Sequence, residues 1–321
     1  MRLKILLSAG AATVALAGTA RAECGEVSIT EMDWASAAVV TAVSKFLMQE
    51  GYGCTVNTFP SSTNPALTSV AETGEPDILT ELWVNTAQGY EALRDEGKIV
   101  PLAPVLSDGG QEGWWVPDYL VEAHPELATL EGVLANPDLV GGRFHNCPDG
   151  WACRIVNDNL AAASGMEEAG IEIFDHGSGE TLATSIAAAY ADEAPWFGYY
   201  WAPTSILGKF PMTMVETAPH DEAAHACNKE ADCAEPTLSA YPSADVLTVV
   251  TADFQERHPE IAELMSKVQF TNAQMGEILA WQEDNSASPD EAAVHFLTTY
   301  PEVWSAWLDD TAREALSALL P

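Results

Sequence analysis

The chain has 321 residues and is strongly acidic, with 48 Asp and Glu residues against 13 Lys and Arg and a formal net charge of −35 at pH 7. Such a charge repels nucleic acid and anionic membranes, so the composition argues against both as partners. An acidic surface poor in lysine is typical of adaptation to salty water, and it would also steer a cationic ligand toward the protein.

The N-terminal segment has the pattern of a secretory signal peptide. Arg2 and Lys4 precede an apolar run over residues 5–17, and residues 20–22 read Ala-Arg-Ala, an A-x-A cleavage site. The mature chain is therefore expected to begin at Glu23. No later apolar run reaches the roughly 18 residues needed to cross a bilayer. We therefore predict a protein exported to the periplasm.

Strand-like and helix-like segments alternate in the first part of the mature chain. The predicted order is strand 27–31, helix 36–50, strand 55–59, helix 64–73 and strand 77–83. This order implies a parallel sheet, which binds ligands at the carboxyl ends of its strands. Trp34 and Trp83 fall at such ends.

A second unit begins near residues 114–117 and continues through residues 139–144, a helix over 181–191 and a strand over 196–201. A β-branched strand over 245–251 and a helical tail over 252–321 are expected to return to the first unit. Two crossings between two units make a hinged clamp. The predicted fold is α/β with two lobes, each a mostly parallel sheet flanked by helices. The predicted parts are a signal peptide (1–22), lobe 1 (23–113 plus 242–321) and lobe 2 (114–241).

Six cysteines in an exported chain predict three disulfides, although six cysteines allow many connectivities. Spacing favours two short loops, Cys147 with Cys153 and Cys227 with Cys233. Cys24 and Cys54 each precede a predicted strand, so neighbouring parallel strands would bring these two together.

Signatures of catalysis and of metal binding are weak. The sequence has neither Gly-x-Ser-x-Gly nor His-Glu-x-x-His, so neither an enzyme nor a cofactor is predicted. His220 and His225 flank two acidic residues but read as surface histidines. Glu230 and Asp232, in the short loop before Cys233, offer carboxylates to Ca²⁺ without EF-hand spacing, so no metal site is predicted.

Four of the ten tryptophans lie at turn-like positions beside small or acidic residues: Trp34, Trp83, Trp151 and Trp201. Indole faces attract cations, each with about 1–2 kcal/mol, so several around one cavity would bind a quaternary ammonium group. The alternative is that they are core residues, as most buried tryptophans are.

Three stretches together resemble the substrate-binding proteins of ABC importers for glycine betaine, choline and related trimethylated solutes. They are Asn-Cys-Pro-Asp-Gly-Trp-Ala-Cys at 146–153, Gly-Ser-Gly-Glu at 177–180, and Ala-Pro-Trp-Phe-Gly-Tyr-Tyr-Trp-Ala-Pro at 194–203. The resemblance covers most of the mature chain. It implies a type II, Venus-flytrap fold and an aromatic cage around the methylated ammonium, with Trp83, Trp151 and Trp201 as walls and Trp34 as a further one. It also implies ligand contacts from Asn146, Gly150 and Tyr200.

The sequence departs from this family where carboxylates are bound. Ala87 and Thr204 stand where glycine betaine binders often have histidines. Meanwhile Glu31 and Glu81 lie near the first two tryptophans and are predicted to face the ligand, although each could instead cap a helix or be solvated. An acidic group suits choline or trimethylamine N-oxide better than a zwitterion whose carboxylate it would repel.

We therefore predict a periplasmic, monomeric solute-binding protein. It would capture trimethylamine N-oxide, choline or glycine betaine in an aromatic cage and deliver it to an ABC permease and its ATPase. One alternative is an exported enzyme acting on a methylated osmolyte with Glu31 or Glu81 as base. Another is a solute sensor that docks on a membrane receptor.

Overall fold

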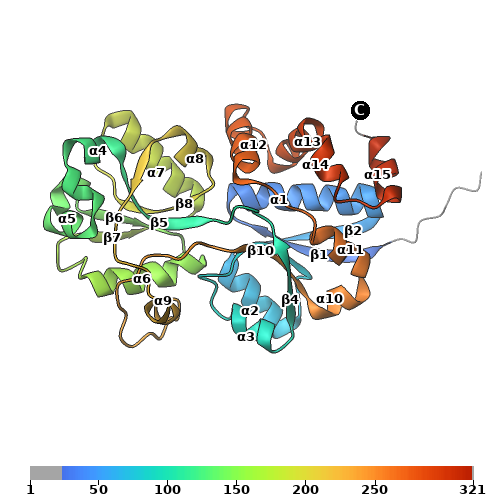
Figure 1. Cartoon of the computed structure of the whole chain (residues 1–321), viewed down its shortest axis with the longest axis horizontal. Helices are drawn as coiled ribbons and strands as arrows, with labels where there is room; N and C mark the ends of the chain where they lie inside the picture. Colours follow the sequence, from blue (N-terminus) through green and yellow to red (C-terminus); the bar gives the residue numbers. More distant parts are fainter. Residues whose placement is uncertain (1–23, 320–321) are drawn as a thin grey trace, which may run out of the picture.

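The computed structural model describes residues 24–319, so the predicted signal peptide lies outside the described residues. The described chain forms two five-stranded sheets, each flanked by helices (Figure 1). Over these residues, no helix has both the length and the apolar character to cross a membrane.

The lobe-1 sheet has the strand order β2-β1-β3-β10-β4. Strand β1 runs parallel to β2 and β3, whereas β10 runs antiparallel to β3 and β4. The bounds are β1 (Gly25–Met32), β2 (Cys54–Ser61), β3 (Ile78–Trp83), β4 (Ile99–Pro104) and β10 (Val246–Thr251).

The lobe-2 sheet has the order β7-β6-β8-β5-β9. Strand β6 runs parallel to β7 and β8, and β5 runs antiparallel to β8 and β9. The bounds are β5 (Gln111–Pro117), β6 (Arg143–Asn146), β7 (Glu172–Asp175), β8 (Gly198–Ala202) and β9 (Met212–Met214). The predicted two-lobe α/β class, with a mostly parallel sheet in each lobe, is confirmed, and one antiparallel strand makes each sheet mixed. The reason is that β5 and β10 enter from the crossings between the lobes and run against their neighbours.

The helices of lobe 1 cover both faces of its sheet (Figure 1). Helix α1, which continues as one π-helical turn over Leu47–Gly51, packs against α13, so the C-terminal helices lie on the first lobe. The bounds are α1 (Ala35–Phe46), α2 (Thr63–Thr73), α3 (Tyr90–Asp95), α10 (Ala252–Arg257), α11 (Pro259–Met265), α12 (Asn272–Asp284), α13 (Pro289–Thr299), α14 (Pro301–Ser305) and α15 (Asp310–Ser317).

The helices of lobe 2 are mostly short, apart from α6 and α7. Helix α7 begins with a capping box, in which the Ser178 hydroxyl accepts from the Thr181 N–H and the Thr181 hydroxyl accepts in return. The bounds are α4 (Asp118–Ala123), α5 (Leu130–Ala135), α6 (Ala152–Ser164), α7 (Gly179–Asp192), α8 (Ser205–Lys209) and α9 (Glu222–Asn228), with 3₁₀ turns at Pro125–Ala128 and Pro137–Val140.

The two crossings between the lobes run side by side. Gly110 and Ala244 form an isolated antiparallel bridge, with N–H···O distances of 2.9 and 3.0 Å in the two directions. Because the described chain passes from one lobe to the other only in these paired segments, a hinge at this point can open and close the space between the lobes.

Three disulfides tie the chain. They join Cys24 to Cys54, Cys147 to Cys153, and Cys227 to Cys233. Spacing favours the last two pairs, and adjacent parallel strands favour the first. The first joins the beginnings of β1 and β2, where Gly25 lies opposite Cys54 in the register.

We expect removal of the Cys24–Cys54 disulfide to lower stability without affecting the region between the lobes. The bridge spans 30 residues of sequence, and closing a loop of that size in the unfolded chain contributes about 3.6 kcal/mol. The bridge and Trp34 lie at opposite ends of β1. This strand is eight residues long, with a rise of about 3.3 Å per residue. Urea denaturation of C24S/C54S should show the loss. A large change in ligand affinity in the same variant would contradict this separation.

Candidate functional site

The four tryptophans singled out in the sequence meet around one cavity between the lobes. The cavity is small in this closed structure, with a volume of about 30 Å³. Its lining consists of Trp34, Thr63, Trp83, Thr86, Glu112, Trp151, Ala152, Cys153, Tyr199 and Trp201.

The indole rings of Trp34, Trp151 and Trp201 meet edge to face and so form adjoining walls. The Trp34 and Trp151 rings have centroids 5.3 Å apart at an interplanar angle of 68°, and the Trp151 and Trp201 rings are 5.0 Å apart at 80°. Tyr199 lies parallel to Trp201 at 6.3 Å. Since Trp34 belongs to lobe 1 and Trp151 to lobe 2, the walls meet only when the lobes are together.

The ends of secondary structure elements place these rings. Trp34 is the N-cap residue of α1, Trp83 is the last residue of β3, Trp151 is the N-cap residue of α6, and Trp201 lies near the end of β8. The carboxyl ends of parallel strands and the amino ends of the following helices share one edge of a sheet. The sequence pattern that predicted Trp34 and Trp83 at this edge is therefore accounted for.

Two glycines allow the close approach of the walls. Gly150 has φ +86°, and a Cβ there would lie 2.5 Å from the Ser62 hydroxyl of the opposite lobe. A Cβ at Gly179 would lie 2.8 Å from the Trp151 ring. Gly150 thus shapes the turn before Trp151 and lets the lobes meet, although it does not line the cavity.

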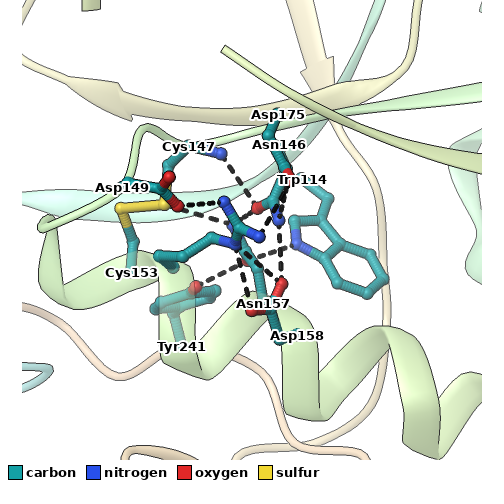
Figure 2. A network of polar contacts seen from close by, with 10 residues as sticks. Trp114, Asn146, Cys147, Asp149, Cys153, Asn157, Asp158, Asp175 and Tyr241 are labelled. Atoms are coloured by element: carbon teal, nitrogen blue, oxygen red, sulfur yellow. Dashed lines mark hydrogen bonds and ion pairs between the residues drawn. A yellow bond between two sulfur atoms is a disulfide. The ribbon is translucent and has the colours of Figure 1, made fainter. Parts of the chain in front are cut away.

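A polar network fixes the loop that carries Trp151 (Figure 2). The Asn146 side-chain oxygen accepts from the Cys147 N–H and from the Asn157 amide, both at 2.9 Å. The Asn157 oxygen in turn accepts from the Trp114 indole at 2.8 Å and the Tyr241 hydroxyl at 2.7 Å. Asn146 is fully buried in this network, so the structure gives it a role behind the loop and not in the cavity lining.

Arg154, in the first turn of α6, joins three carboxylates. Its guanidinium lies 2.6 Å from Asp149, 3.0 Å from Asp158 and 2.9 Å from Asp175. These acidic groups would repel one another without the cation. The ion pairs therefore hold the first turn of α6 and, with it, the Trp151 ring.

Direct contacts across the cleft show that the lobes are closed in this structure. The Trp151 indole donates to Asp33 Oδ1 at 2.8 Å, and the Asn64 N–H donates to the Gly150 carbonyl at 3.2 Å. Burial raises the pKa of Asp33, while its hydrogen bond from Trp151 opposes the shift.

Helix α9 and the disulfide-closed loop that follows it make a second set of contacts across the cleft. His225 donates to the Asn85 carbonyl at 2.8 Å, and Gln88 donates to Glu230 at 3.1 Å. Lys229 pairs with Glu91. Residues 24–319 contain no group of three or more His, Cys, Asp or Glu side chains that could hold a metal ion.

Glu112 is the one charged residue among the described residues that line the cavity, and it was missed in the sequence. It is 4% exposed, and its oxygens accept from the Tyr199 hydroxyl and the Asn85 amide, each at 2.7 Å. Burial raises the pKa of Glu112 to about 7 against the effect of these hydrogen bonds. The one feature of the sequence that could have indicated Glu112 is its position directly before the apolar run Gly113-Trp114-Trp115.

The two glutamates predicted to face the ligand lie elsewhere. Glu81 is fully buried, with Oε1 accepting from the Trp34 indole and the Ser36 hydroxyl, both at 2.7 Å. Burial raises its pKa to about 7. Glu31 lines a separate groove on the outer side of Trp34 and Trp201.

Tyr200 also lies outside the cavity. Successive side chains of a strand point to opposite faces, and in β8 this places Tyr199 in the cavity and Tyr200 in the outer groove. The sequence correctly located the segment but not which of the two tyrosines faces inward.

The sequence of the chain is similar to those of known binding proteins. Residues 25–299 match the family described as the substrate binding domain of ABC-type glycine betaine transport systems. The trimethylamine N-oxide-binding protein of Pelagibacter ubique (strain HTCC1062) is 22% identical over 249 residues, which make up 72% of this chain and 75% of that protein.

Solved structures share the two-lobe fold. An ABC-transporter choline-binding protein in complex with choline has a TM-score of 0.76 at 18% identity, covering 93% of this chain and 99% of that one. A glycine betaine/L-proline-binding protein from Borrelia burgdorferi has a TM-score of 0.74 at 16% identity, covering 90% and 99%. Lactococcal OpuAC, closed on glycine betaine, has a TM-score of 0.69 at 18% identity, covering 89% and 100%.

We expect the raised pKa of Glu112 to make the unfolding free energy depend on pH. Its pKa is about 7 in the folded protein against an ordinary value of 4.5, so its contribution is fully present below pH 4.5 and is lost as the pH rises through 7. The variant E112Q lacks this pH-dependent contribution to the unfolding free energy. Between pH 5.5 and 8.5, wild type should therefore lose about 2 kcal/mol relative to E112Q in urea denaturation.

The matched control is E291Q. Glu291 is an exposed helix-cap carboxylate whose pKa is lowered by hydrogen bonds from Ser288, so its contribution is lost only at acid pH. Wild type and E291Q should therefore keep a constant difference over this range. The same constancy for E112Q would contradict the raised pKa.

Proposed function

Since the chain belongs to the family of substrate-binding domains of ABC-type glycine betaine transport systems, we propose that it captures trimethylamine N-oxide in its aromatic cage. The family consists of transport proteins and not of enzymes. On this proposal the protein works in the periplasm as a monomer, and it releases the bound solute to an ABC permease driven by its ATPase.

The observation that carries the proposal is the set of four indoles around one small cavity. A trimethylated ammonium group has no N–H to donate, so hydrogen bonds cannot replace the water that it loses on binding. Aromatic faces can, with about 1–2 kcal/mol from each ring. Three or four rings would supply much of the roughly 8 kcal/mol that a micromolar affinity needs.

The polar residues of the cavity favour an N-oxide over a carboxylate. Among the described lining residues none is Lys, Arg or His, so the carboxylate of glycine betaine would have no cationic partner. Glu112, when protonated, can donate to the N-oxide oxygen, and its pKa of about 7 keeps that form populated near neutrality. The similarity to the Pelagibacter ubique protein supports the same ligand.

Choline is the second candidate. The ionised form of Glu112 would accept from the choline hydroxyl, and the cage would bind its trimethylammonium group equally well. The small size of the cavity favours the more compact N-oxide.

Closure of the lobes would complete the site. Lobe 1 offers Trp34 and Trp83 and lobe 2 offers Trp151 and Trp201, so opening at the Gly110–Ala244 hinge would separate the walls. The bonds from Trp151 to Asp33 and from Asn85 to Glu112 would then break together. A permease that holds the lobes apart would in this way lower the affinity for the solute.

The alternative of an exported enzyme lacks a base in the right place. Neither Glu31 nor Glu81 lines the cavity, and the family assignment points to transport. A receptor-docking sensor would use the same cage, and a gene for a permease beside this one would favour the importer.

Truncation of a cage wall should weaken binding of trimethylamine N-oxide. We expect W151A and W201A each to raise the dissociation constant at least tenfold, because each loses a ring worth about 1–2 kcal/mol and leaves a gap. Isothermal titration calorimetry measures this directly. The matched control is W281A, whose ring stacks on His295 between α12 and α13, away from the cavity. Unchanged affinity in both cage variants would refute the cage.

Glu112 should make the affinity for trimethylamine N-oxide depend on pH. Ionisation through pH 7 removes the donor and places a negative charge beside the N-oxide oxygen. The ratio of the wild-type to the E112Q dissociation constant should therefore rise about tenfold from pH 6 to pH 8.5. Glu81 is present in both proteins, so any effect of its ionisation on the two dissociation constants cancels in their ratio. For choline the same ratio should fall, and a ratio that is constant for both ligands would exclude Glu112 from their recognition.

A further inference from the structure

Glu81 is a buried carboxylate that no ligand contact explains. It lies in the centre of β3 with no exposed surface, behind the cage and outside its lining. Its backbone has φ +50°, a left-handed conformation that is rare for a residue other than glycine. Such conformations persist only where the surroundings hold them, and they gather at functional sites.

Glu81 is linked to the cage by a hydrogen bond from the Trp34 indole. Oε1 accepts from the Trp34 Nε1–H and from the Ser36 hydroxyl, both at 2.7 Å. The nearby Trp83 indole also favours the ionised form of this carboxyl group. Glu81 therefore lies directly behind the two walls that lobe 1 contributes.

The negative charge of Glu81 has no counter-ion in the described part of the chain. No Lys, Arg or His there forms an ion pair with it, and its Oε2 is buried without a hydrogen-bond partner. A buried charge without a partner is destabilising. The pKa of Glu81, raised to about 7, is the expected consequence.

We propose that Glu81 is a positioning residue of the cage, which fixes the Trp34 indole and supplies, through that ring, the negative charge that the bound ammonium group neutralises. This inference rests on the proposed function. The interior of the closed protein screens charges weakly, so a carboxylate one ring away from the cation still attracts it. An N–H that donates to an anion also polarises its ring, which strengthens the attraction of the ring face for a cation.

A glutamine at position 81 would still fix the Trp34 indole but would supply no negative charge. Its amide oxygen accepts from the same indole and hydroxyl, while the charge is absent. Because glutamine has nearly the same shape as glutamate, E81Q removes the charge and leaves the hydrogen bonds to Trp34 and Ser36 in place. S36A makes the complementary change, because it removes one hydrogen bond to Glu81 and keeps the charge.

The test compares wild type, E81Q and S36A at pH 8.5, where Glu81 is ionised. The charged probe, named for its positively charged nitrogen, is trimethylamine N-oxide, which has no net charge, or choline, whichever binds wild type more tightly. The uncharged probe is its carbon isostere, tert-butanol or 3,3-dimethyl-1-butanol, measured by competition. We expect E81Q to weaken the charged probe about fivefold to tenfold and to change the uncharged probe less than twofold. S36A should change the charged probe less than threefold.

Each other outcome overturns the inference. Equal weakening of both probes, or as large a loss in S36A as in E81Q, would mean that Glu81 acts only as a scaffold for Trp34. Unchanged binding in E81Q would mean that the charge has no effect. E81Q should also have a thermal midpoint at pH 8.5 no lower than that of wild type, and a less stable or unfolded E81Q would show that the charge is compensated. If wild type binds neither charged probe, the proposed function itself fails.

Discussion

A trimethylated ammonium group is charged but cannot donate a hydrogen bond, and on the proposed function this constraint accounts for the arrangement of the site. Water solvates such a cation through its dipole, so a protein must offer negative potential without polar contacts. Indole faces do this, but they are large and must stand around a small volume. Edge-to-face contacts between Trp34, Trp151 and Trp201 meet that requirement. The lobes, the hinge and the network behind Asn146 serve to bring those rings together and hold them.

Two glutamates of similar pKa have different places in this arrangement. Glu112 lies in the cavity wall and is held by Tyr199 and by Asn85 of the opposite lobe. Glu81 lies behind an indole and is shielded from the ligand. Both pKa values are raised by burial to about 7. On our account, Glu112 reads the polar end of the ligand and Glu81 adds to the potential that its methylated end meets.

The sequence predicted the order of elements well because their hydrophobic patterns are local. Trp34 and Trp83 could be placed at a common edge because β1 and β3 run parallel, and that edge is a property of the topology. What the sequence could not supply depends on tertiary contacts. The choice between Tyr199 and Tyr200 depends on which face of β8 meets the cavity, and Glu112 comes from β5, whose antiparallel entry through the hinge brings its first residues to the site. Glu81 was recognised as an acidic neighbour of the cage, but its burial behind Trp34 follows only from the packing of α1 on the sheet.

The central claim is that the closed cage selects trimethylamine N-oxide. The most direct measurement is a titration of the mature protein, followed by intrinsic tryptophan fluorescence, with trimethylamine N-oxide, choline, glycine betaine and proline betaine at fixed salt and pH 7. The account predicts a saturable change at micromolar trimethylamine N-oxide and a much weaker response to glycine betaine. Tightest binding of glycine betaine would contradict the assignment of the ligand. A lack of response to all four would contradict the cage.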